Sequence, residues 1–260
     1  MNPHLNERIL EVRQVSLAFG GTQALSDVSF DVCKGEVRAI IGPNGAGKSS
    51  MLNCINGIYQ PQLGSIHLRG QPMRQLSSRT VAELGVARTF QNLALFKGMS
   101  ILDNLLAGRN LRMKSNLLWQ ALRIGPAERE EIEQRQVVEH IIDFLELQPW
   151  RHAPVGSLPY GLQKRVDLGR ALAMEPDVLL LDEPMAGMSV EEKHDMSRFI
   201  IEANDAFGTT VVLIEHDMSV VMTISDRIVV LDYGRKIGDG TPDEVRSNEA
   251  VIRAYLGARH

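Results

Sequence analysis

A glycine-rich stretch in the first quarter of the chain reads Gly42, Pro43, Asn44, Gly45, Ala46, Gly47, Lys48, Ser49, Ser50. It fits the pattern G-x-x-x-x-G-K-[S/T], in which glycines let successive backbone N–H groups turn inward on phosphate oxygens. The segment Glu36 to Ile41 before it predicts a strand, and Met51 to Ile58 after it predicts a helix. The pattern therefore predicts a phosphate site, with Lys48 neutralising the terminal phosphates and Ser49 ligating magnesium. Without its flanking strand and helix, the stretch would indicate only a glycine-rich turn.

A second buried strand ends in acidic residues. Val178 to Leu181 is an apolar run, and Asp182 and Glu183 follow it directly. Ligands of open parallel sheets collect at the carboxyl ends of the strands, so we expect Asp182 to hold magnesium through water and Glu183 to polarise an attacking water. A polar strand end before a turn is the alternative, and a phosphate loop elsewhere in the chain favours the catalytic interpretation.

Two further polar residues follow predicted strands. His216 comes after the strand from about Thr210 to Glu215, where a neutral imidazole orients a water or contacts the terminal phosphate. Taken alone, a histidine at a strand end is more often a structural hydrogen-bonding group. Gln91 follows a β-rich segment from Val86 to Phe90, and taken alone it is equally well explained by turn chemistry.

The order of predicted elements indicates an α/β fold. Two alternating strands, Ile9 to Phe19 and Ala24 to Val32, flank a Gly-Gly turn and predict an antiparallel start. The region from about Ile101 to Glu146 is predicted to be helical. The second half alternates helices and strands, which favours a parallel sheet, and two short strands and helical turns end the chain.

Composition narrows the class of protein. The chain has 260 residues, with 28 Lys and Arg against 32 Asp and Glu, so we expect no nucleic-acid partner. No apolar run approaches the ~18 residues needed to span a bilayer. The N-terminal residues lack the pattern of a secretory signal, and two cysteines cannot form a disulfide framework. We therefore expect the chain to lie in the cytoplasm.

These motifs, in this order, resemble the nucleotide-binding subunit of ABC transporters, and among these the ATPases of branched-chain amino acid importers. The subgroup resemblance rests on 87–92, 157–165 and 251–257. It implies a P-loop NTPase of the ABC type that binds ATP and Mg²⁺, with a mixed sheet core, an N-terminal antiparallel β subdomain and an inserted helical subdomain. The implied bounds are 9–92 and 166–240 for the core with its β subdomain, 93–165 for the helical subdomain and 241–260 for a helical tail.

The resemblance also implies roles for single residues. Residues 42–50 correspond to the Walker A loop and 178–182 to the Walker B strand. Glu183 corresponds to the catalytic glutamate and His216 to the switch histidine, while Gln91 corresponds to the glutamine that contacts magnesium and the attacking water. Phe19 stands where the family keeps an aromatic ring that stacks on adenine, and a core phenylalanine is its alternative.

Two positions depart from the family pattern. The signature, usually Leu-Ser-Gly-Gly-Gln, is here Leu158, Pro159, Tyr160, Gly161, Leu162. The usual serine is missing and Pro159 has no N–H, so we expect the backbone N–H groups of Tyr160, Gly161 and Leu162 to contact the phosphate at the start of a helix. Ser189 occupies the place of the D-loop aspartate, so communication between the two ATP sites is expected to differ in detail.

The implied assembly is a dimer in which each ATP lies between the Walker A loop of one subunit and the signature of the other. The second ATPase is either a copy of this chain or a related chain, and the resemblance favours a heterodimer. Permease subunits are expected to dock on the helical region after Gln91, with Leu93 to Met99 as candidates, at the cytoplasmic face of the membrane. A separate solute-binding protein, outside the membrane, would deliver the substrate.

Alternatives to this function remain open from the sequence. Urea, short amides or aromatic acids would use a similar ATPase. A soluble ABC protein of DNA repair or of the ribosome usually carries two nucleotide domains or long insertions, and this chain has a single phosphate loop. The departures in the signature suggest another alternative, a binding module that is regulated by nucleotide and does not turn over ATP. The presence of Lys48, Asp182, Glu183 and His216 argues against it.

Overall fold

The computed structural model describes residues 7–89, 93–111 and 126–257. The chain divides into two compact units, each described here by itself. The first comprises Met1–Arg88, Asp177–Pro184 and Ile200–His260, and the second comprises Thr89–Pro176 and Met185–Phe199. The subdomain bounds expected from the sequence stay a prediction.

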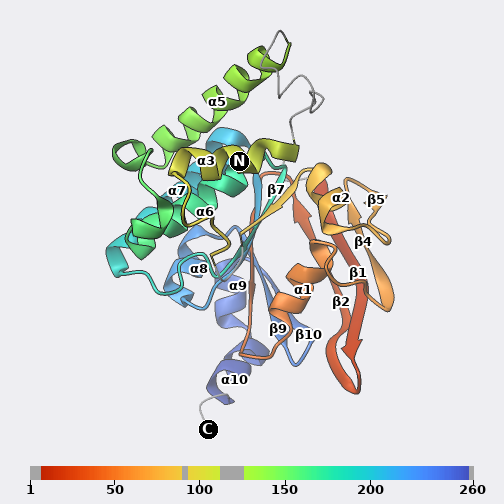
Figure 1. Ribbon diagram of the computed structural model, residues 1–260. Helices are drawn as coiled ribbons and strands as arrows, with labels where there is room; N and C mark the ends of the chain where they lie inside the picture. The colour runs from red at the N-terminus through yellow and green to blue at the C-terminus, as the bar shows by residue number, and fades with distance from the viewer. Residues whose placement is uncertain (1–6, 90–92, 112–125, 258–260) are drawn as a thin grey trace. The chain divides into compact units, whose positions relative to one another are not determined.

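A six-stranded sheet forms the centre of the first unit (Figure 1). Its strands, in spatial order, are β10 (Arg235–Gly240), β9 (Arg227–Asp232), β3 (Val37–Ile41), β8 (Thr210–Ile214), β7 (Val178–Asp182) and β6 (Val86–Arg88). All neighbours are parallel except β10 and β9, so the sheet is mixed. Every residue of β3, β7 and β8 is buried, which explains why these strands are nearly continuous apolar runs. The carboxyl ends of the parallel strands share one edge of the sheet.

A second, antiparallel sheet belongs to the same unit and has the order β2 (Thr22–Cys33), β1 (Arg8–Phe19), β4 (Leu63–Leu68), β5 (Gln71–Pro72). Figure 1 shows helix α1 (Lys48–Ile55) between the two sheets, and α1 contacts both β2 and β7. Met51, Leu52 and Ile55 of α1 are fully buried in the core that the two sheets share. The helix that follows the glycine loop is therefore held on both sides by apolar packing.

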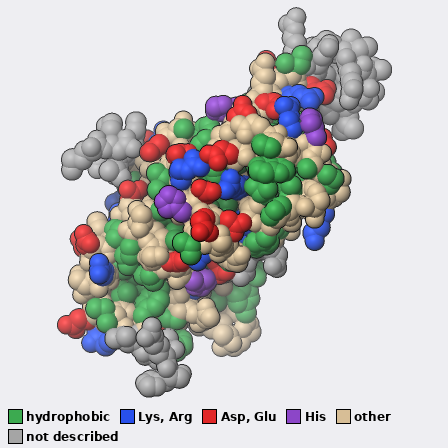
Figure 2. Space-filling view, turned by 90° about the vertical axis from the view of Figure 1, so that its left-hand side faces the viewer, with side chains coloured by type: hydrophobic (Ala, Val, Ile, Leu, Met, Phe, Trp, Pro, Cys, Tyr) green, Lys and Arg blue, Asp and Glu red, His purple; other side chains and the backbone are tan. Residues whose placement is uncertain are grey.

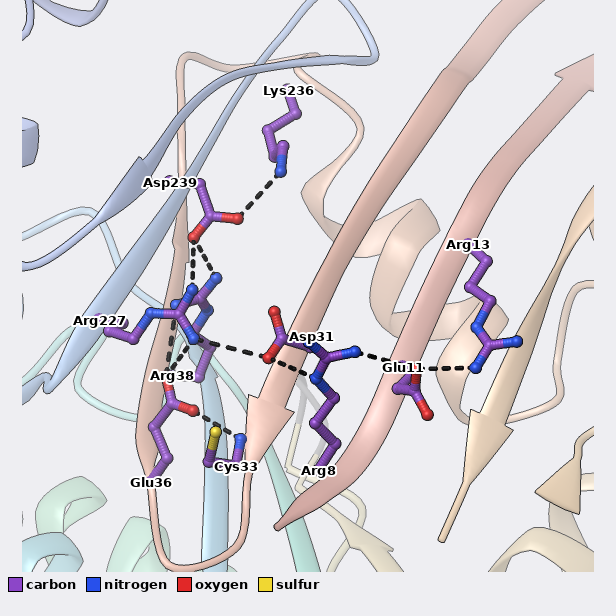
Figure 3. Close-up of polar contacts among 10 residues, drawn as sticks. All are labelled: Arg8, Glu11, Arg13, Asp31, Cys33, Glu36, Arg38, Arg227, Lys236 and Asp239. Carbon is purple, nitrogen blue, oxygen red and sulfur yellow. Dashed lines mark hydrogen bonds and ion pairs between the residues drawn. The ribbon is translucent and has the colours of Figure 1, made fainter. Parts of the chain in front are cut away.

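Charged side chains join the two sheets at the ends of the strands that lie away from the glycine loop (Figure 3). Arg38 of β3 is fully buried and pairs with Glu36 and with Asp239 of β10. Arg227 of β9 lies 3.8 Å from Asp31 of β2, which belongs to the other sheet. Burial raises the pKa of Glu36, and the Arg38 guanidinium acts in the opposite direction. The network therefore connects the six-stranded sheet to the antiparallel sheet.

Short helices complete the first unit: α2 (Ser78–Glu83), α8 (Met218–Ile224), α9 (Pro242–Ser247) and α10 (Glu249–Gly257). Helix α9 begins with a capping box in which the Thr241 hydroxyl accepts from the Glu244 N–H and the Glu244 carboxylate accepts from the Thr241 N–H. Asp217 caps α8 in the same way that Ser77 caps α2, each by accepting a backbone N–H.

The second unit is helical. It contains α3 (Ile101–Gly108), η1 (Arg109–Leu111), α5 (Pro126–Phe144), η2 (Gln148–Trp150), η3 (Val155–Ser157), α6 (Tyr160–Leu172) and the first part of α7 (Val190–Phe207). Helices α3, α5 and α6 contact one another, as Figure 1 shows. Gly169 lets α6 pack closely on the end of α5, because a Cβ there would lie 2.8 Å from Cδ1 of Leu145, the residue that follows α5.

Two features of the structure bear on the composition: the distribution of charged side chains on the surface and the apolar character of the helices. Figure 2 shows acidic and basic side chains interspersed on the face in view rather than gathered by sign. Within the described residues, none of the helices combines the length and the apolar character needed to cross a bilayer.

Candidate functional site

The glycine loop leads from the end of β3 into α1. Gly42, Gly45 and Gly47 have φ values of 150°, 80° and 96°, which side chains disfavour. The packing is equally restrictive, because a Cβ on Gly42 would lie 2.0 Å from the Leu231 carbonyl oxygen and one on Gly47 would lie 2.4 Å from that of Ala24. Only glycine fits at these two positions, and the loop is held closely against β9 and β2.

Lys48 is the first residue of α1, and 6% of it is exposed. Its ammonium donates to the carbonyl oxygens of Gly42 at 2.8 Å and Pro43 at 2.9 Å, so the loop holds its own lysine in place. Burial lowers the pKa of Lys48, while the charges of Glu183 and Asp182 act to raise it. A bound phosphate anion would add negative charge beside this buried cation.

Asp182 ends β7 and is 4% exposed. Its Oδ2 atom accepts from Arg88 Nη2 at 2.8 Å, and the Arg88 Nη1 atom also donates to Asn53 Oδ1 on α1 at 2.6 Å. The other carboxylate oxygen, Oδ1, is buried and has no hydrogen-bond partner among the residues that the structure describes. Arg88 thus fixes one side of the carboxylate and leaves the other oxygen for a ligand.

The donor set around Asp182 fits Mg²⁺. Mg²⁺ prefers oxygen ligands and is usually held by one or two carboxylates together with substrate phosphates and waters. The unpartnered Asp182 Oδ1 and the exposed Ser49 hydroxyl at the start of α1 supply oxygens of this kind. No group of three or more His, Cys, Asp or Glu side chains that would hold a metal occurs in the described parts of the chain, so this site would depend on the phosphates of a nucleotide.

Glu183 and His216 meet at the same edge of the sheet. Their Oε1 and Nε2 atoms are 2.6 Å apart, with 17% and 43% of the side chains exposed. Glu183 has a φ of 51°, uncommon for a residue with a side chain, while its N–H still donates to the Ile214 carbonyl at 3.0 Å. Backbone strain of this kind concentrates at functional sites. The turn at Glu183 directs its carboxylate to His216 rather than along the strand.

Phe19 lies at the end of β1 and is 47% exposed, so its interpretation as a core phenylalanine is wrong. Its ring contacts Tyr59 edge to face, with centroids 4.9 Å apart. Adenine stacking by Phe19 stays a prediction.

The prediction for Gln91 falls outside the described residues.

The signature residues belong to the second unit. Helix α6 begins at Tyr160, and its N-cap residue, Pro159, makes no side-chain capping hydrogen bond. The Tyr160 ring, 45% exposed, lies over Gly187, where an added Cβ would be 3.2 Å from the ring. Gly161 is equally confined, because a Cβ there would lie 2.0 Å from the Glu192 carboxylate. The signature thus lies at a helix start, and contact of its backbone N–H groups with phosphate stays a prediction.

Ser189 has a local role that accounts for one departure from the family pattern. Its hydroxyl accepts from the Glu192 N–H at 3.2 Å, and its own N–H donates to the Glu192 carboxylate at 2.8 Å. This reciprocal pair begins α7. A serine caps a helix as well as an aspartate does, so the substitution preserves the local turn.

Comparisons with known proteins decide the family. Residues 25–186 match the ABC transporter family, and residues 235–260 match the family described as branched-chain amino acid ATP-binding cassette transporter. The chain belongs to the ABC transporter family. Its mixed sheet and its glycine loop are those of the family's ATPase subunit, and the chain is an ATP-hydrolysing subunit of an ABC transporter.

Relatives of this ABC subunit align over almost its whole length. The high-affinity branched-chain amino acid transport ATP-binding protein BraF of Pseudomonas aeruginosa is 39% identical over 97% of this chain and 99% of its own. The corresponding protein LivG of Escherichia coli K12 is 36% identical with the same coverage. The ADP conformation of an ATP-binding cassette of an ABC transporter has a TM-score of 0.83 at 31% identity, covering 96% of this chain and 99% of its own. A nucleotide-free cassette gives a TM-score of 0.82 at 30% identity, covering 95% and 98%. These matches confirm the family resemblance and the fold class.

Two residues of the candidate nucleotide site, Arg88 and Tyr255, could not be identified from the sequence. Arg88 was considered only as part of a subgroup motif, although a basic residue at the end of an apolar strand predicts an acidic partner nearby. Tyr255, from the C-terminal motif, lines an open pocket of about 700 Å³ together with Gly42, Asn44 and His216.

Proposed function

We propose that this chain powers the uptake of branched-chain or related amino acids through separate permease subunits. The observation that carries the substrate class is the match of 235–260 to the branched-chain cassette family, together with the full-length relatives BraF and LivG. Those relatives are named for high-affinity branched-chain amino acid transport, and nearly the whole of each aligns with this chain.

In this proposal the hydrolytic chemistry lies at the carboxyl edge of the parallel strands. The N–H groups of the glycine loop and the Lys48 ammonium bind the nucleotide phosphates. Glu183 accepts a proton from the attacking water, and His216, 2.6 Å away, holds the Glu183 carboxylate in position. Mg²⁺ bound to Ser49, Gln91 and Asp182 would neutralise charge on the phosphates. Catalysis here consists of positioning and charge stabilisation by fixed groups.

A second ATPase subunit is part of the proposal. Each ATP would lie between the glycine loop of one subunit and the helix start at Tyr160, Gly161 and Leu162 of the other. ATP would favour the closed dimer because it makes contacts there that the open state lacks, and hydrolysis would remove them. The partner is a second copy or a related chain, and the subgroup resemblance favours the related chain.

The loop 93–99 supports docking of a permease. Asn104 of α3 is fully buried, and its side chain accepts from the Phe96 N–H at 2.9 Å and donates to the Phe96 carbonyl at 3.0 Å. This bidentate contact fixes the loop backbone, while 55% of Phe96 and 38% of Met99 remain exposed. Exposed apolar side chains on a fixed backbone fit a partner's apolar helix. The permease would hold this chain at the cytoplasmic face of the membrane, and a solute-binding protein on the other side would deliver the substrate.

Purification of the complex from its own membranes tests the proposal. The chain carries Glu183→Gln and ATP is present, so the closed state persists. We expect two multispanning permeases and a second ATPase to copurify, and uptake of labelled leucine, isoleucine or valine to require the wild-type chain. Recovery of ribosomes or repair proteins alone would overturn the transport function, and uptake of only urea, short amides or aromatic acids would overturn the substrate class.

A matched pair of variants tests the docking loop in the same experiment. Phe96→Glu places a charge on the exposed loop, whereas Ile132→Glu places one on α5, where 52% of Ile132 is exposed. We expect Phe96→Glu to lose the permeases and Ile132→Glu to retain them. Equal recovery from both variants would contradict docking at 93–99.

A further inference from the structure

The turn between β9 and β10 contacts the glycine loop. Asp232 pairs with Arg235 across it, and its two central residues are Tyr233 and Gly234. Their φ values are 43° and 75°, as in the two-residue turn whose twist matches that of a hairpin. The Tyr233 side chain is 87% exposed, and the turn contacts its neighbours through the backbone of Gly234.

Gly234 forms backbone hydrogen bonds with two separate segments. Its N–H donates to the carbonyl of Ala46 in the glycine loop, with N and O 3.1 Å apart. Its carbonyl accepts from the N–H of Ser26 in β2 at 2.8 Å. One residue of the turn therefore connects the glycine loop to the antiparallel sheet.

The Ala24 carbonyl of β2 lies close to both the glycine loop and the turn. An added Cβ on Gly47 would lie 2.4 Å from this oxygen, and one on Gly234 would lie 2.6 Å from it. Both positions also have a positive φ, 96° and 75°, which favours glycine. The loop, the turn and β2 are thus packed together at one point, where a side chain would force them apart.

The bond to Ala46 fixes the direction of a donor in the loop. Ala46 and Gly47 are joined by a trans peptide group, whose C=O and N–H point in opposite directions. Because the Ala46 carbonyl is held by Gly234, the Gly47 N–H is directed away from the turn. Gly47 is the N-cap of α1, and N–H groups at a helix start are those that bind phosphate.

We propose that Gly234 is a positioning residue for nucleotide binding, and that the β9–β10 turn braces the glycine loop through the hydrogen bond from the Gly234 N–H to the Ala46 carbonyl. This inference rests on the proposed phosphate site. The turn holds the Ala46–Gly47 peptide in the direction that receives phosphates. Preorganisation of this kind strengthens binding because less order has to be created when the ligand arrives.

The test is ADP binding by the full chain, measured by titration calorimetry for Gly234→Ala and Gly70→Ala. Gly70 lies in the turn between β4 and β5 and has a φ of 74°, but an added Cβ there meets nothing within 4 Å. Both variants therefore strain a turn of the same kind, and only Gly234→Ala pushes its turn away from β2 and Ala46. Loss of one hydrogen bond predicts ADP affinity weakened ~3- to 10-fold in Gly234→Ala. We expect Gly70→Ala to bind like the wild type.

A second variant removes the hydrogen bond without adding a Cβ. Replacement of Gly234 by glycolic acid puts an ester oxygen in place of the Gly234 N–H and keeps the backbone free of new side-chain atoms. This variant tests the bond to Ala46 even where Gly234→Ala does not fold. We expect the same weakening of ADP affinity.

The outcomes separate this role from a general loss of stability. Wild-type ADP affinity in either folded Gly234 variant, or equal weakening in Gly70→Ala, would overturn the brace. Lys48→Met, measured in parallel, should bind ADP weakly whatever the role of Gly234. Wild-type affinity in Lys48→Met would overturn the phosphate site itself and this inference with it.

Discussion

The Nε2 atom of His216 lies 2.6 Å from the Oε1 atom of Glu183, although the two residues follow different strands of the sheet. The contact joins the ends of β8 and β7, and the left-handed φ of Glu183 makes it possible. A carboxylate held by a neighbouring imidazole is fixed in direction, which is the property that a group positioning a water requires.

His216→Ala should therefore lower the rate of ATP hydrolysis rather than the affinity for nucleotide. The Glu183 carboxylate loses the partner that orients it, and we expect kcat to fall by about 10²-fold, as for loss of a group that supports proton transfer. ATPase assays of the assembled complex, with ADP binding measured in parallel, check this. Weakened ADP binding with an unchanged kcat would show that His216 binds nucleotide instead of orienting Glu183.

Arg88→Met should destabilise the fold much more than Arg69→Met. The side chains of Arg88 and Asp182 are 6% and 5% exposed, and removal of one member of a buried pair costs about 3 kcal/mol or more because the other charge is left alone. Arg69 pairs with Asp177 in the same unit, but these side chains are 49% and 45% exposed, and such pairs contribute less than about 1 kcal/mol. Urea unfolding of the two variants gives the comparison. Equal losses in the free energy of unfolding would contradict the conclusion that the buried Arg88–Asp182 pair stabilises the fold more than the exposed Arg69–Asp177 pair.

The lowered pKa of Lys48 predicts a pH dependence of nucleotide binding. In the free protein, burial holds this pKa below 10.5, so the ammonium loses its proton at a lower pH than in the unfolded chain. Between these two pKa values the unfolded state binds more protons, and the contribution of Lys48 to stability therefore rises with pH in that window. Bound phosphates favour the charged form, so ADP affinity should fall as pH rises through the lowered pKa.

Titrations over a pH series measure this effect, with Lys48→Met as the control. The variant should bind ADP weakly and lack the component of the pH dependence that comes from residue 48. The same slope in both proteins would assign the pH dependence to another group.

The elements nearest the phosphate loop could be predicted from sequence because their signals are local. Strand β7 was predicted at Val178 to Asp182, where the structure has it, since a buried parallel strand is a continuous apolar run. Strand β4 was missed because Gly64 and Ser65 interrupt its pattern. Helix α8 was missed because its seven residues are rich in β-branched side chains, which favour strands, and its Asp217 cap is a weak signal in isolation.

Some residues of the candidate site could be predicted from local motifs, and others could not. Lys48, Asp182 and Glu183 belong to motifs whose residues adjoin one another, and each motif can be placed from the apolar strand that precedes it. Arg88 and Asp182 are 94 positions apart, and Tyr255 lines the same pocket as Gly42 from the other end of the chain. Both relationships depend on which strands are neighbours and on where a C-terminal helix packs. One chain without its fold does not contain that information in any local pattern.

The most direct test of the account is steady-state ATP turnover by the assembled complex carrying Glu183→Gln, with Glu83→Gln as the control. Glu83 lies on α2, where 47% of its side chain is exposed and pairs with Arg79. The account predicts that Glu183→Gln binds ATP but hydrolyses it at least ~10²-fold more slowly, whereas Glu83→Gln turns over like the wild type. Wild-type turnover by Glu183→Gln would contradict the assignment of Glu183 as the group that activates water.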